Sequence, residues 1–174
     1  MKPLSLFKTR HFFLAVFCLL FVFSSCQKKS EFTSVNTITA TVDGVDVRFN
    51  KVATAHYANI LSAQYAPTLV INGATATTSI VITVTSPRPV TDTTYISSDT
   101  GNVVPSCDMV YYPAQPEQYY ITNNFATGST TVTITSITNN NVTGTFSGTL
   151  VYFINGDPTP PKIITNGKFN LKIN

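Results

Sequence analysis

Hydrophobic and polar positions alternate along most of the chain after residue 36, which is the spacing of half-buried β-strands. Thr37–Val42 and Val45–Phe49 alternate on either side of Asp43-Gly44. This dipeptide favours a tight hairpin, because both central turn positions need a positive φ angle. Similar runs follow along the chain. They predict strands at Thr68–Asn72, Thr75–Ser86, Thr93–Ser97, Asp108–Tyr112, Gln118–Asn123, Thr130–Ile137, Val142–Ile154, Ile163–Thr165 and Lys168–Ile173.

Turn-forming residues lie between these runs. Asn72-Gly73, Asn139–Asn141 and Asn166-Gly167 predict turns, the first of them a hairpin, and Asn155–Pro161 predicts an exposed loop. Val52–Ser62 is ambiguous, because the spacing of its small apolar residues also fits a short helical turn.

Two details of the pattern bear on how the strands are arranged. Ser79–Thr85 is apolar on both sides at its centre, which predicts a central strand. Gly144 and Gly148 interrupt a long strand, which predicts a bulge or a sharp bend. About eight to ten short strands with hairpin-length connections predict an all-β fold, either a single antiparallel β-sandwich or a partly closed barrel. Strands do not alternate with helices, so a parallel sheet is not expected.

The first 25 residues have a different composition. Lys2, Lys8 and Arg10 precede Phe12–Phe23, a run without a polar residue. This run is shorter than the roughly 20 residues that a bilayer-spanning helix needs, and it matches the apolar region of a secretory signal peptide. We therefore expect a lipoprotein signal peptide at 1–25, a lipidated cysteine and flexible tether at 26–36, and an all-β domain at 37–174.

Phe23-Ser24-Ser25-Cys26 resembles a bacterial lipobox, in the looser form typical of Bacteroidota-type lipoproteins. The resemblance implies cleavage between Ser25 and Cys26 and attachment of lipid to the Cys26 thiol. Two or more acyl chains give stable anchoring, whereas one gives only marginal binding. Two alternatives stay open: an ordinary cleaved leader in which Cys26 is incidental, and a short uncleaved anchor.

The charge of the chain changes once the leader is set aside. Lys2, Lys8 and Arg10 account for the whole formal charge of +3, so the remaining chain sums to zero. A neutral domain with few basic residues lacks the electrostatic attraction that nucleic-acid binding requires. Beside the anchor, Lys28-Lys29 is the one basic pair that could face a membrane.

Several segments of the expected domain resemble one group of proteins. The segments are Thr39–Gly44 at its start and Gly128–Ile134, Val142–Gly148 and Ile164–Asn170 near its end. They are similar to small Bacteroidota-type envelope lipoproteins assigned to domains of unknown function. The resemblance implies a small all-β envelope lipoprotein, and it implies no set of catalytic residues.

Candidate chemistry within the domain is sparse. Cys107 and His56 are its only cysteine and histidine, and they suit either a thiolate–imidazole pair or ordinary packing, which we favour. Asp43 and Asp46 are read as hairpin residues rather than calcium ligands, and one Cys with one His is too few for a zinc site. We expect no enzyme activity, no metal and no cofactor.

Tyrosines and two glycan acceptor motifs are the remaining candidates. In a hairpin, Tyr111-Tyr112 and Tyr119-Tyr120 would each send one ring to the core and one outward. The outer pair would either contact a protein or glycan partner or stabilise the hairpin, which we favour.

Asp92-Thr93-Thr94 resembles an O-glycosylation motif of Bacteroidota-type exported proteins, which would place glycan on Thr93. Asn141-Val-Thr143 is a formal N-glycosylation triplet to which we assign no role in a bacterium.

Taken together, the sequence predicts a lipid-anchored, non-catalytic binding or structural module of the bacterial envelope. We expect it at the outer membrane, and its membrane face stays open. Two alternatives are a surface-fibre subunit similar to fimbrillin-like pilins and a lipocalin-like carrier of a small apolar ligand. A hydrolase built on Cys107 and His56 is the weakest alternative.

Overall fold

The computed structural model describes residues 35–58, 66–97, 105–114, 118–122, 129–154, 157–158 and 160–174. All of them belong to one compact unit, Ser34–Asn174. The expected signal peptide, Ser25, Cys26 and most of the tether lie outside the described residues.

The described part of the chain is all-β, as predicted, and contains no helix. Its strands are β1 Thr37–Val42, β2 Val45–Phe49, β3 Val52–Ala58, β4 Thr68–Ala74, β5 Ser79–Thr85, β6 Thr94–Ile96, β7 Ser106–Tyr112, β8 Tyr120–Thr122, β9 Thr130–Ile137, β10 Asn141–Val151, β11 Phe153–Ile154, β12 Asp157–Pro158 and β13 Lys162–Lys172. These thirteen labelled strands exceed the predicted eight to ten, and β6, β8, β11 and β12 are only two or three residues long.

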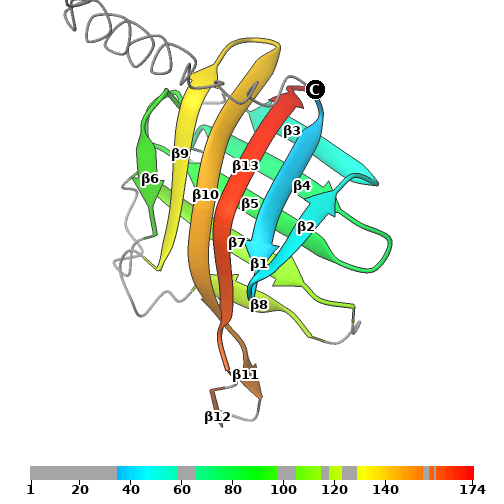
Figure 1. The fold of residues 1–174 in the computed structure, drawn as a ribbon. Helices are drawn as coiled ribbons and strands as arrows, with labels where there is room; N and C mark the ends of the chain where they lie inside the picture. The colour runs from blue at the N-terminus through cyan, green and yellow to red at the C-terminus, as the bar shows by residue number, and fades with distance from the viewer. Residues whose placement is uncertain are drawn as a thin grey trace, which may run out of the picture. The chain divides into compact units, whose positions relative to one another are not determined.

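Eleven strands form one antiparallel sheet with the order β2-β1-β13-β10-β8-β7-β5-β4-β3, and β9 and β6 extend it from β10. The long strand β10 belongs to two parts of this sheet. Val142–Gly148 pairs with β9, and Leu150 and Val151 pair with β8. The sheet folds over at this point into a front layer, β6-β9-β10-β13-β1-β2, and a back layer, β8-β7-β5-β4-β3, whose strands run obliquely behind it (Figure 1).

The back layer also contacts the front layer on the side of β3, where the end of β13 lies against this strand. Ala55 forms a bridge with Ile173, and the Asn174 N–H donates to the Ala55 carbonyl at 3.0 Å. The fold is therefore intermediate between the two predicted forms: two layers pack face to face, and the sheet that makes them is nearly closed. Near-complete closure leaves few unpaired strand edges.

One hydrophobic core fills the space between the layers. Inward side chains alternate with outward ones along each strand, and in β5 the buried residues are Ile80, Ile82 and Val84. The central position predicted for this strand is confirmed, since β5 lies between β4 and β7. The largest fully buried side chains are Phe49, Phe169, Ile38, Leu69, Ile71, Ile80, Ile82, Met109, Ile134, Leu150, Ile164 and Leu171.

The predicted irregularity at Gly144 and Gly148 is confirmed. The register of β10 shifts against β9 between Thr143 and Gly144, and against β13 between Phe146 and Gly148. Bulges bend a strand and increase its twist. In β10 they allow one strand to serve both layers.

The hairpin predicted at Asn72-Gly73 is misplaced. Both residues lie inside β4, and the turn falls at Thr75–Thr78, where the Thr75 Oγ1 accepts the N–H groups of Thr77 (3.1 Å) and Thr78 (2.9 Å). The close packing around this strand position explains the glycine. A Cβ at Gly73 would be 3.0 Å from side-chain atoms of Ile38, Phe49 and Ile80.

Three further local predictions are corrected. Val52–Ala58 is strand β3 rather than a helical turn, since each of its residues pairs with β4, and residues 59–62 lie outside the described residues. Asn166-Gly167 is not a turn between two strands but a bulge inside the continuous β13, with Asn166 at φ 53°. Part of the Asn155–Pro161 loop is paired, because Asp157–Pro158 forms β12 against β11.

Candidate functional site

A group of tyrosines gathers where β7, β8 and the end of β10 meet. β7 and β8 pair Tyr111 with Tyr120, and both rings are buried in the core. The alternate residues point outward: Tyr112 is 42% exposed and Tyr119 is 48% exposed, with ring centroids 6.2 Å apart and planes tilted by 40°. This is the one-inward, one-outward arrangement that the strand alternation predicts.

Tyr152 extends this group, and the sequence pattern missed it. Its ring centroid lies 6.0 Å from that of Tyr119 and 5.7 Å from that of Tyr120. Tyr112, Tyr119, Tyr152 and Tyr120 therefore form one chain of ring contacts, which we call the tyrosine cluster. Tyr152 joins it because the end of β10 pairs with β8, a long-range pairing that no local alternation of residues reveals.

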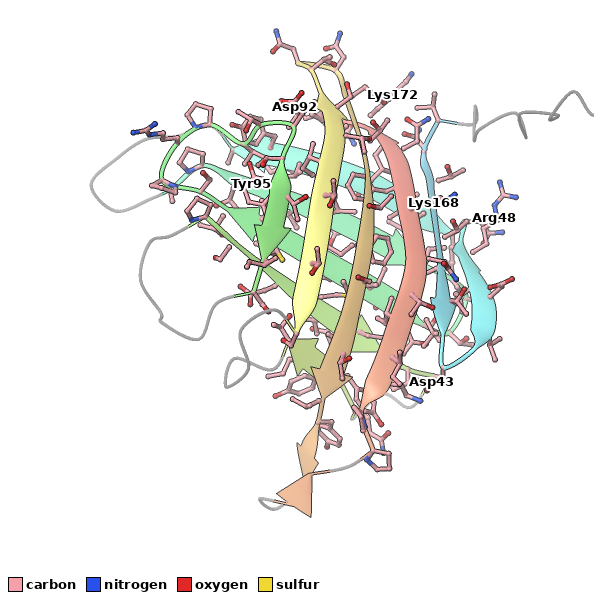
Figure 2. All side chains as sticks on the ribbon, turned by 60° about the vertical axis from the view of Figure 1, so that its left-hand side comes forward. Asp43, Arg48, Asp92, Tyr95, Lys168 and Lys172 are labelled. Atoms are coloured by element: carbon pink, nitrogen blue, oxygen red, sulfur yellow. The ribbon has the colours of Figure 1, made fainter. Side chains whose placement is uncertain are left out.

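An ion pair lies beside the buried end of the cluster. Lys162 Nζ lies 2.5 Å from Asp43 Oδ2 and 5.5 Å from the centroid of the Tyr120 ring. The Ile163 N–H also donates to Asp43 Oδ1 at 2.9 Å. Figure 2 shows Asp43 at the end of the domain opposite Lys172. Since the β1–β2 turn carries Asp43 and the first residue of β13 is Lys162, the pair joins two strands that are neighbours in the sheet.

The pair also sets the charge at this end of the domain. Burial raises the pKa of Asp43, but the hydrogen bonds from Lys162 and Ile163 and the charge of Lys162 outweigh it and hold the pKa below its usual value. The hydrogen bond with Asp43 raises the pKa of Lys162. Both groups are therefore charged at neutral pH and neutralise each other. Asp43 serves the hairpin turn and this pair, and within the described residues no three metal-ligating side chains gather together.

The cluster is suited to contact rather than to catalysis. Tyrosine presents a large, rigid and partly apolar surface with a polar hydroxyl at its tip, a combination that is enriched in binding surfaces. Here the rings are held by paired strands, so a partner would meet them already ordered. The same ring contacts also stabilise the pairing of β7 with β8.

The structure does not bring Cys107 and His56 together. Cys107 points into the core from β7 and is 1% exposed, with its Sγ 3.3 Å from the Tyr95 carbonyl oxygen. His56 points outward from β3, on the opposite face of the sheet, and its Nδ1 lies 2.9 Å from the Asn174 oxygen. β4 and β5 separate their strands.

Burial and the nearby Asp108 raise the pKa of Cys107 to about 12, which keeps the thiol protonated at neutral pH. Because only the thiolate is a good nucleophile, we expect Cys107 to resist iodoacetamide in the folded protein and to react fully in denaturant. Counting alkylated cysteines by mass spectrometry, with and without urea, checks this. Rapid modification of Cys107 in the folded chain would contradict the buried position.

Thr93 is exposed immediately before β6, next to the exposed Asp92. Its carbonyl oxygen accepts the N–H of Ile134, so the backbone here is fixed while the side chain stays accessible. Glycosylation of Thr93 remains a prediction. Asn141, from the formal N-glycosylation triplet, begins β10 and donates from its amide nitrogen to Asn170 Oδ1 at 3.3 Å.

In the part of the chain that the structure describes, no helix has the length and apolar character to span a membrane. Neither protein-family models, nor curated proteins, nor solved structures give a significant match to the chain.

Proposed function

We propose that this protein is a lipid-anchored module of the bacterial cell envelope, held at the outer membrane through Cys26, that binds a partner without catalysing a reaction. The observation that carries the binding role is the pair of exposed rings at Tyr112 and Tyr119, which continues to Tyr152. Exposed aromatic residues on a rigid scaffold are typical of contact surfaces, and contact residues contribute most where they are ordered beforehand.

The anchoring half of the proposal is supported by the N-terminal sequence. A basic start, an apolar run too short to span a bilayer and small residues before Cys26 are the features of a lipoprotein leader. The non-catalytic half is supported by the chemistry of the domain. Its one free thiol in the described region is buried and protonated, and His56 lies on the other face of the sheet.

The two alternative functions find less support. A carrier needs an empty interior, but the interior here is filled by large side chains, and a Cβ at Gly73 would be only 3.0 Å from three of them. A fibre subunit needs an accessible strand edge. The edge strand β2 carries the exposed charged residues Asp46 and Arg48, and the edge strand β6 is three residues long. The third edge strand, β3, is bridged to Ile173 through Ala55. Charged and short edges oppose strand addition.

Replacing Cys26 with alanine tests the anchor. Because the predicted attachment atom is the thiol, we expect Cys26→Ala to move the protein from the membrane fraction to the soluble fraction of disrupted cells. Cys18→Ala, which lies within the apolar run, is the matched control and should leave the protein in the membrane fraction. Wholly membrane-bound Cys26→Ala would overturn the anchoring role.

A further inference from the structure

The outer face of the back layer carries a continuous apolar row. Val81 on β5 pairs with Val110 on β7, Val110 pairs with Ile121 on β8, and Ile121 pairs with Val151 on β10. All four side chains point away from the core and are only half-buried. We call these four residues the outer row. Its members lie side by side across four strands, whereas the outward side of a sheet that faces only water is normally polar.

Charge is distributed unequally between the two outer faces. The front layer exposes Arg48, Lys168 and Lys172 on its outer side (Figure 2). Among the described outward residues of β3, β4, β5, β7 and β8, Asp108 is the one acidic side chain, and none is Lys or Arg. Depletion of charge together with exposed tyrosine is the composition of the core of a protein–protein interface.

Two polar groups flank the outer row at equal distances along β7. Tyr112 lies two residues after Val110 and Asp108 two residues before it, which is about 7 Å on either side. Both side chains are exposed on the same face. No described residue donates a hydrogen bond to the Asp108 carboxylate, and burial raises the pKa of this group.

This arrangement is complementary to itself. A two-fold axis that runs along the outer row would stack two back layers face to face, with the sheets about 10 Å apart. Val110 of each copy would then meet the row of the other copy. Tyr112 of each copy would lie over Asp108 of the other, where the phenol O–H can donate to the carboxylate. We propose that the outer row binds a second copy of this chain.

Other occupants fit this face less well. Aliphatic side chains cannot donate hydrogen bonds to or accept them from sugar hydroxyls, and an anionic lipid surface would need the basic residues that the described part of this face lacks. The contact would be small. Four strand widths by about seven residues give roughly 450 Å² per copy, or about 900 Å² in total, which is the range of weak, reversible complexes.

Weak association suffices for proteins held on one surface. Anchoring confines copies to a thin layer and raises their effective concentration, as linkage does for tethered modules. In this respect the inference rests on the proposed function, and it names a second copy of the chain as the binding partner. Val110 occupies the axis, so this position is the most sensitive one to probe.

The test uses the full chain in membranes, carrying Val110→Cys. A bis-maleimide reagent that spans about 10 Å should join two copies through this position. Thr145→Cys is the matched control, since Thr145 is exposed on β10 in the front layer. We expect a covalent dimer from Val110→Cys at least ten times more abundant than from Thr145→Cys. Adding Val81→Lys to the Val110→Cys chain should reduce the dimer at least tenfold, while the melting temperature stays within a few degrees.

Each other outcome overturns the inference. Equal dimer yields at the two positions would indicate random collision, and a product of different mass would show another protein on this face. A Cys at position 110 that labels with a single maleimide but gives no dimer would show that no second copy docks there. Repeating the experiment with purified full chain in detergent at raised concentration separates dimerisation from anchoring. If the purified chain forms the dimer in detergent and Cys26→Ala moves to the soluble fraction of cells, both proposals are supported. If the purified chain forms no dimer in detergent, the dimer proposal fails, while the anchoring proposal still depends on the Cys26→Ala result alone.

Discussion

Replacing Gly167 with alanine is expected to lower the free energy of unfolding by on the order of 3 kcal/mol. Gly167 lies opposite Phe146 across β13 and β10. An added Cβ would be 2.5 Å from Phe146 Cδ2 and would overlap the Phe146 carbonyl oxygen. A ring carbon can move, but a backbone oxygen in a paired strand cannot move without disturbing the pairing. Thermal denaturation followed by circular dichroism should show a melting temperature lower by roughly 6–12 °C.

Gly44→Ala is the control for this substitution. Gly44 has φ 81° in the β1–β2 turn, and no other atom lies within 4 Å of the position that a Cβ would take. Only the cost of the left-handed backbone conformation remains, about 1 kcal/mol. Gly167→Ala should therefore be clearly more destabilising than Gly44→Ala. Equal losses would show that Phe146 does not cover Gly167.

The sequence predicted most accurately the elements whose causes are local. The bounds of β1 and β2 agree with the prediction to the residue, because Asp43-Gly44 specifies the turn and strict alternation specifies the strands. The inward and outward tyrosines of β7 and β8 were predictable for the same reason. Strand alternation depends only on backbone geometry.

The errors concern residues whose local preference fits two structures. Asn-Gly favours a hairpin turn and equally favours a bulge, since both place a residue at positive φ. At Asn166-Gly167 the neighbours decide: β1 and β10 pair with β13 on both sides, so the chain continues straight and forms a bulge. At position 73 the glycine is explained by the close approach of Ile38, Phe49 and Ile80 and not by a turn. These neighbours are far away in the sequence, and no local pattern contains them.

The candidate sites also contain features that local alternation predicts and features that depend on long-range strand pairing. The outward position of Tyr112 and Tyr119 follows from alternation, but the addition of Tyr152 requires β10 to pair with β8. Likewise, the outer row needs the register of four strands, although the apolar centre of β5 already predicted a central strand. Alternation therefore predicts which face a side chain takes, and long-range pairing determines what lies beside it.

Phe169→Ala is expected to destabilise the domain by about 3–5 kcal/mol. Phe169 is 2% exposed, and its ring stacks on that of Phe146 with centroids 6.4 Å apart and planes 24° from parallel. It also covers Gly144, which pairs with it across β10 and β13 and has no side chain that could fill the space left by the ring. Urea denaturation should show a lower midpoint with an unchanged slope.

Ile163→Ala is the control on the same strand, since Ile163 is 51% exposed and should lose no more than about 0.5 kcal/mol. A second measurement tests the cause of the loss. In the wild-type protein, a Cβ at position 144 would overlap both the Phe169 ring and the Thr133 carbonyl oxygen. Removing the ring leaves only the second overlap, so Gly144→Ala should be less destabilising in the Phe169→Ala background than alone. If the two losses simply add, Phe169 does not lie over Gly144, because substitutions without a shared contact are independent.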